Sequence, residues 1–159
     1  MEQAIFAAGC FWGVQYYFDQ VPGVTSTLVG YTGGTTENPT YEEVSTHTTG
    51  HGEAVLIEFD ADTVSYETLV KQFFRMHDPT QLNRQGPDVG DDYRSAIFYV
   101  TDEQKEIAEQ VKADLQSKFG GEIVTEITEA GPFYRAEEYH QKYTEKTGDG
   151  TSHVPYAPL

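Results

Sequence analysis

The chain contains a single cysteine, Cys10, which lies in the segment IFAAGCFWG at residues 5–13. A single thiol is most often a small buried apolar side chain. Here, however, Gly9 separates a short apolar run from an aromatic segment typical of a helix, so we expect Cys10 at a strand-to-helix junction. Unpaired N–H groups and the helix dipole favour a thiolate at the first turn of a helix. We therefore expect a reactive Cys10 with a lowered pKa.

Several kinds of chemistry are compatible with such a thiol. A cysteine hydrolase needs a histidine base, for which His51 is a candidate. A binding protein without enzymatic activity would keep Cys10 as a structural residue, with Phe11 and Trp12 in the core. If these two aromatic side chains instead lie at an exposed turn, they require an apolar ligand. A metal site is disfavoured, because the histidines, including the i,i+4 pair His47 and His51, accompany neither a second cysteine nor an HExxH motif.

Length and composition predict one globular domain that spans residues 1–159. Twenty-six acidic residues against ten basic residues give a formal net charge of -16, which disfavours nucleic acid and anionic membranes as partners. One cysteine cannot form an internal disulfide, and the sequence shows neither a signal-peptide pattern nor an apolar run of about 18 residues. We therefore expect a cytoplasmic protein.

The pattern of apolar residues predicts strands and helices that could position this thiol. Ser65 and Thr101 are suitable N-caps for two of the helices. Residues 80–92 show no periodicity and are expected to form a long polar loop. Strands are expected at 3–8, 25–34, 52–60, 95–100 and 123–129, and helices at 11–18, 66–77, 102–119 and 136–146. This order predicts an α+β fold, a two-layer α/β sandwich with a mixed, largely antiparallel sheet.

Six segments, in order and over almost the whole chain, carry a resemblance to one enzyme family. They are GCFWG (9–13), GYTGG (30–34), NPTYEEV (38–44), GHGEAV (50–55), HDPTQLNRQGPDVGDDYRSAIFY (77–99) and PFYRAEEYHQKY (132–143). Together they resemble the peptide methionine-S-sulfoxide reductase (MsrA) family. The resemblance implies an oxidoreductase that reduces methionine-S-sulfoxide, free or in oxidised proteins, to methionine without a bound metal or organic cofactor.

The resemblance also implies a role for each site residue. Cys10 attacks the sulfoxide sulfur, and Glu53 donates a proton to the sulfoxide oxygen. A carboxyl group in an aromatic pocket can stay protonated near neutral pH, which suits Glu53 to that role. The resemblance further implies that substrate binds to Phe11 and Trp12, which enclose its methyl group, to Tyr41 and Tyr93, which hold its oxygen, and to Asp88 in the same site.

Regeneration of the thiol is the point at which this sequence departs from many members of that family. The first half of the reaction leaves Cys10 as a sulfenic acid. Many members of the family resolve this state with further cysteines near the C-terminus, but the tail EKTGDGTSHVPYAPL at 145–159 has none. We therefore expect a single-cysteine form in which an external thiol reduces Cys10, namely thioredoxin, or glutaredoxin with glutathione.

Overall fold

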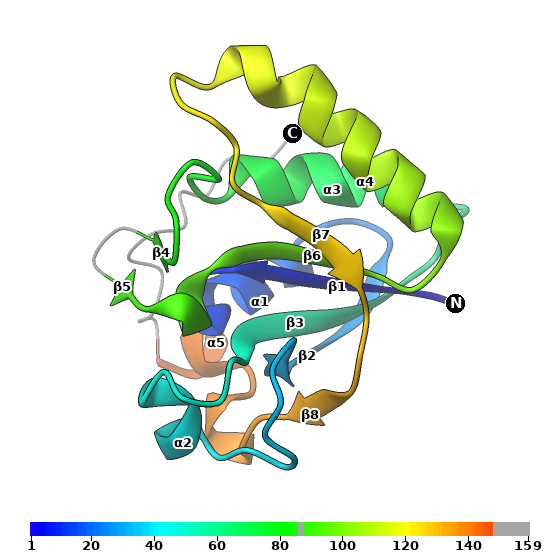
Figure 1. Ribbon diagram of the computed structural model, residues 1–159. Coiled ribbons are helices and arrows are strands. Elements are labelled where there is room, and N and C mark those ends of the chain that lie inside the picture. Colours follow the sequence, from blue (N-terminus) through cyan, green and yellow to red (C-terminus); the bar gives the residue numbers. More distant parts are fainter. Residues whose placement is uncertain (86–87, 148–159) are drawn as a thin grey trace.

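A computed structural model describes residues 1–85 and 88–147 and is built around a six-stranded sheet (Figure 1). The strand order is β7-β6-β1-β3-β2-β8, and within this sheet only β6 and β7 run parallel. The strands are β1 (Glu2–Ala8), β2 (Val24–Thr32), β3 (Gly52–Phe59), β6 (Ser95–Tyr99), β7 (Glu126–Glu129) and β8 (Phe133–Arg135). The predicted mixed, largely antiparallel sheet is thus confirmed.

Helices cover the sheet, and two of them begin at the predicted caps. The Ser65 and Thr101 side chains accept hydrogen bonds from the backbone N–H groups of Thr68 and Gln104. The helices are α1 (Phe11–Asp19), α2 (Tyr41–Ser45), α3 (Tyr66–Arg75), α4 (Asp102–Leu115) and α5 (Tyr143–Thr147), with the 3-10 turns η1 (Asp91–Tyr93), η2 (Gln116–Lys118) and η3 (Glu138–His140). None of the helices in the described ranges is long and apolar enough to cross a bilayer.

The main core lies between one face of the sheet and the helices α1, α3 and α4. At its centre Phe6 of β1 stacks on Phe18 of α1 and Phe73 of α3, with ring centroids 5.4 and 5.3 Å apart. Alternation along β1 sends Ile5 and Ala7 to a smaller apolar cluster on the other face. This arrangement confirms the predicted α+β fold with its two layers.

The segment after residue 132 differs from the prediction of one helix over 136–146. The structure has β8 at the sheet edge, then η3 and the short helix α5 (Figure 1). The Gln141 side-chain amide accepts a hydrogen bond from Val29 N at 3.0 Å and donates one to Val29 O at 2.9 Å, so it extends the edge of β2 as a strand would. Lys142 then takes a positive φ of 57°, which no helix interior allows.

The predicted polar loop over 80–92 also contains local structure. It includes a small antiparallel pair, β4 (Arg84–Gln85) and β5 (Asp88–Val89), followed by η1. Such short elements carry no periodicity that a sequence could reveal. Residues 86–87 of this loop and residues 148–159 of the cysteine-free tail lie outside the described part of the chain.

Candidate active site

Cys10 lies at the predicted junction, where β1 ends and α1 begins. Gly9 turns the chain with a positive φ of 92°, and Cys10 is the residue that precedes the first turn of α1. The backbone N–H groups of Trp12 and Gly13 point toward the thiol and favour its thiolate form. β1 lies in the interior of the sheet, between β3 and β6. Because β1 and β3 are antiparallel, the end of β1 that leads to Cys10 lies beside the start of β3.

That neighbouring strand supplies Glu53, near the start of β3. Its side chain is only 2% exposed, and its Oε1 accepts a hydrogen bond from the N–H of Phe11 at 3.2 Å. Burial raises the pKa of Glu53 well above its ordinary value, the Phe11 N–H opposes this shift, and the charges of Asp92 and Asp88 add to it. The carboxyl group therefore favours its protonated form directly beside the residue that follows Cys10.

The predicted lowering of the Cys10 pKa is wrong for the ligand-free protein. Burial raises the pKa of the thiol, the charge of Glu53 raises it further, and the N–H groups of Trp12 and Gly13 only partly offset these effects. The helix terminus does favour the thiolate as expected. However, removal of the thiolate from water destabilises it by more free energy than the hydrogen bonds from two N–H groups stabilise it. The resting site thus favours the thiol form of Cys10 and the protonated form of Glu53.

The two tyrosines predicted to hold a substrate oxygen lie together at the same site. Tyr41 is the first residue of α2, and a hydrogen bond joins its side chain to that of Tyr93, at the end of η1. Burial raises the pKa of both phenols, and the charges of Glu53 and Cys10 raise them further. Both side chains therefore remain neutral. One hydroxyl proton is used in the bond between them, and the other is available to an oxygen placed near Cys10.

Asp88 lies at the start of β5, and its charge acts on the same two groups. It raises the pKa of Cys10 and that of Glu53. Asp88 therefore lies close enough to Cys10 and Glu53 for its charge to act on both groups. A negative charge here helps to keep the carboxyl group of Glu53 protonated.

Sequence reasoning did not single out His140, which holds the aromatic residues after Cys10. The indole Nε1 of Trp12 donates a hydrogen bond to His140 Nδ1 at 2.9 Å, and the Trp12 ring stacks on Tyr143 at 3.8 Å. The His140 ring also contacts Phe11 and Tyr41, with ring centroids 5.3 and 4.7 Å apart. Burial lowers the pKa of His140, so it stays neutral. The sequence feature that could have pointed to His140 is its place within PFYRAEEYHQKY, one of the segments that carry the family resemblance.

Glu137 was missed as well, and it fixes the position of α2. Its Oε2 accepts a hydrogen bond from the backbone N–H of Tyr41 at 3.0 Å, and its Oε1 accepts one from the hydroxyl of Tyr31 at 2.9 Å. Tyr31 is the partner of Glu53 in the register of β2 and β3. One carboxylate thus ties the start of α2 to the sheet beside the candidate acid.

His51 has a structural role and is not available as a base. Its Nδ1 accepts a hydrogen bond from Gly34 N at 3.0 Å, so its Nε2 carries the proton and donates to Thr36 O at 2.6 Å. The residue is 2% exposed. With both ring nitrogens engaged in holding the loop after β2, the hypothesis of a cysteine hydrolase loses its base.

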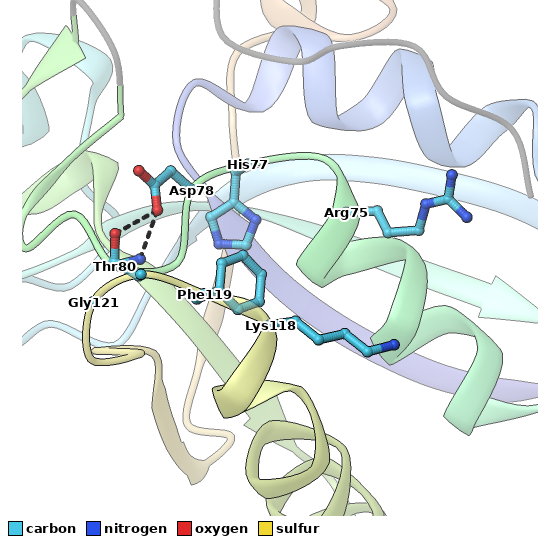
Figure 2. A pocket seen from close by; sticks show the side chains of 8 residues that line it. Arg75, His77, Asp78, Thr80, Lys118, Phe119 and Gly121 are labelled. Atoms are coloured by element: carbon cyan, nitrogen blue, oxygen red, sulfur yellow. Dashed lines mark hydrogen bonds between the residues drawn. The ribbon is translucent and has the colours of Figure 1, made fainter.

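A cavity of about 630 Å³ lies elsewhere on the molecule (Figure 2). Figure 2 shows Arg75 and His77 from the end of α3 on one side and Lys118 and Phe119 on the other. None of the candidate site residues lines it. The ring nitrogens of His77 contact Phe73 O and Ser95 Oγ, both at 2.7 Å, so this histidine supports the packing of α3 on β6.

The coupling of Cys10 and Glu53 predicts how the thiol responds to substitution of the acid. Over the alkaline range in which Cys10 titrates, Glu53 is ionised and its carboxylate raises the pKa of the thiol. Glu53→Gln removes that carboxylate, so the pKa of Cys10 is expected to fall. The rate of alkylation by iodoacetamide, followed from neutral to alkaline pH, measures this pKa. Glu58→Gln makes the same chemical change farther along β3 and should leave the profile unaltered. An unchanged Cys10 profile in Glu53→Gln would contradict the coupling.

Comparisons with known proteins agree with this geometry. The family profile described as peptide methionine sulfoxide reductase matches residues 2–159. The peptide methionine sulfoxide reductase MsrA of Pasteurella multocida is 56% identical over 142 residues, 89% of this chain and 82% of its own. That of Methanothermobacter thermautotrophicus is 56% identical over 147 residues, 91% of this chain and 87% of its own.

Solved structures of the same kind superpose on most of the chain. Methionine sulfoxide reductase A of Corynebacterium diphtheriae has a TM-score of 0.84 at 39% identity, and the match covers 94% of this chain and 76% of the other. Reduced Mxr1 from Saccharomyces cerevisiae has a TM-score of 0.92 at 32% identity, covering 99% of this chain and 91% of the other. The chain therefore belongs to the peptide methionine sulfoxide reductase family.

Proposed function

We propose that this protein reduces methionine-S-sulfoxide, free or in oxidised proteins, with Cys10 as the nucleophile and Glu53 as the proton donor. The observation that carries the assignment is the contact between Glu53 Oε1 and the N–H of Phe11 at 3.2 Å. It holds a buried acid with a strongly raised pKa at the helix terminus that also carries the thiol. A sulfoxide needs such an acid, because its oxygen must lose negative charge before the sulfur accepts a nucleophile.

The first half-reaction transfers one oxygen atom and two electrons. The sulfur of Cys10 attacks the sulfoxide sulfur while Glu53 protonates the sulfoxide oxygen, and the resulting carboxylate accepts the thiol proton. The sulfur–oxygen bond then breaks with loss of the protonated oxygen as water, which leaves Cys10 bonded to the substrate sulfur. A water molecule next attacks the Cys10 sulfur, the sulfur–sulfur bond breaks with its electron pair on methionine, and Cys10 becomes a sulfenic acid. No external proton is consumed in this half. Glu53 thus acts as a relay, and a thiol with a raised pKa suffices as long as the acid lies beside it.

The aromatic residues supply binding and stereochemical selectivity. Phe11 is buried in the core against His140, whereas Trp12 is only partly buried, donates to His140 and offers its indole face to the methyl group of the substrate. Tyr41 and Tyr93 are neutral and hydrogen-bonded to each other, and the pair provides a hydroxyl donor for the sulfoxide oxygen. With the methyl group fixed, only one epimer directs its oxygen to Glu53 and the tyrosines. The R epimer is therefore expected to be a poor substrate.

Regeneration requires two thiol equivalents from outside the chain. A first thiol attacks the Cys10 sulfenic acid to give a mixed disulfide and water, and a second releases Cys10 and leaves the reductant as a disulfide. The sequence has no second cysteine to take the first of these steps. Mxr1 from Saccharomyces cerevisiae has also been solved in complex with Trx2, which supports a reductant of the thioredoxin type; glutaredoxin with glutathione is the other candidate.

Glu53→Gln tests the proposed acid directly. Glutamine keeps the shape of the side chain but supplies no proton, so kcat for methionine-S-sulfoxide should fall by roughly 10²–10⁴-fold while substrate binding changes little. Single-turnover formation of methionine measures the reductive step without interference from regeneration. Glu58→Gln, on the same strand, is the matched control and should retain the rate of the parent protein. A Glu53→Gln variant within a few-fold of the parent rate would remove Glu53 from the mechanism.

The fate of Cys10 tests the second half of the proposal. One equivalent of methionine-S-sulfoxide without any reductant should give one methionine and a monomer heavier by one oxygen, about 16 Da, with the mass located on Cys10. Peptide mass spectrometry after trapping with a reagent selective for sulfenic acids reads this out, and Cys10→Ser should give neither product. Turnover through a disulfide-linked dimer would instead show that a second copy of the chain acts as the reductant.

A further inference from the structure

Three side chains with metal-binding atoms meet beside the loop that carries Tyr93. They are His47, which follows α2, and Asp91 and Asp92 of η1, and one ligand atom of each lies within 4.8 Å of the others. His47 Nδ1 lies 2.7 Å from Asp92 Oδ1 and 3.7 Å from Asp91 Oδ1. The proposed reaction uses none of these groups as its nucleophile or acid.

The burial of Asp92 is the second observation that points to a ligand. Its side chain is 1% exposed, its Oδ1 is paired with His47, and its Oδ2 has no hydrogen-bond partner among the described residues. Within the described part of the chain, the buried Oδ1 of Asp91 also has no hydrogen-bond partner. A buried carboxylate is costly unless donors or a cation compensate its charge. One imidazole, whose side chain is 45% exposed, is a small compensation for two carboxylates.

We propose that His47, Asp91 and Asp92 bind one divalent transition-metal ion, for which Zn²⁺ is the representative probe. Ligand atoms at about 2.1 Å from a tetrahedral Zn²⁺ lie about 3.4 Å from one another, and the observed separations of 2.7 and 3.7 Å lie on either side of that value. An imidazole nitrogen favours Zn²⁺ and its neighbours in the first transition row over Mg²⁺ and Ca²⁺. The exposed side of His47 gives the ion a path of entry.

The sequence disfavours a metal site because its histidines are dispersed and no recognised motif is present. The fold assembles this cluster from two segments far apart in the chain, which spacing does not reveal. The site is distinct from the catalytic pair, but Asp92 immediately precedes Tyr93. A bound ion would therefore fix η1 to the turn after α2 and hold the loop that presents this tyrosine.

Calorimetric titration with Zn²⁺ alone tests the proposal. The Cys10→Ser variant serves as the parent protein, because it removes the thiol as a competing ligand. One Zn²⁺ per chain is expected to bind, and the same titration with Mg²⁺ should show no binding. Asp92→Asn and His47→Gly should each weaken Zn²⁺ binding by at least about 10-fold, since each removes a direct ligand. Asp62→Asn, an exposed carboxylate elsewhere, should leave it unchanged.

Two variants keep this test decisive. His47 has a positive φ of 63°, which glycine adopts freely, so His47→Gly is expected to fold even if the buried change Asp92→Asn is not tolerated. Circular dichroism of the metal-free variants checks the fold. The absence of Zn²⁺ binding to the Cys10→Ser parent would overturn the proposal. Stoichiometric binding that is as tight in His47→Gly as in the parent would overturn it as well, because the ligands would then lie elsewhere.

Discussion

Burial of the Glu53 carboxyl group against the first turn of α1 is the constraint on which the rest of the site depends. The hydrogen bond from Phe11 N anchors the carboxyl group at the helix terminus, while exclusion of water keeps it protonated. The same exclusion of water raises the pKa of Cys10. Nucleophile and acid are therefore tuned by one cause, and neither can be altered without a change in the other.

The sheet and the C-terminal segment serve this contact in different ways. The interior position of β1 next to β3 brings the thiol and the acid to the same end of the sheet. The segment after β8 closes the site from the side, because Glu137 fixes the start of α2 and His140 fixes Trp12. Gln141 in turn fixes that segment to the edge of β2 at Val29. The rigid parts of the fold thus hold side chains from five separate segments in one place.

Local patterns in the sequence predicted much of the fold, and long-range contacts explain where they failed. The strand expected at 52–60 and the cap at Ser65 required only neighbouring residues, and both predictions were confirmed. The C-terminal helix was wrong because a side chain, Gln141, pairs with a strand that lies far away in the sequence. The direction of the Cys10 pKa was wrong for the same reason, since its burial arises from segments that the sequence does not show to be adjacent. The roles of the site residues came from the family resemblance, and spacing alone would not have given them.

The protonation state of Glu53 in the ligand-free protein is the most direct test of this account. The infrared difference spectrum between the parent protein and Glu53→Gln, recorded at neutral pH, isolates the bands of this one side chain. A protonated Glu53 should give the carbonyl band of a carboxylic acid in the parent protein, and this band should be absent from the variant. The bands of an ionised carboxylate in its place would show that burial does not keep Glu53 protonated and would contradict its role as the acid.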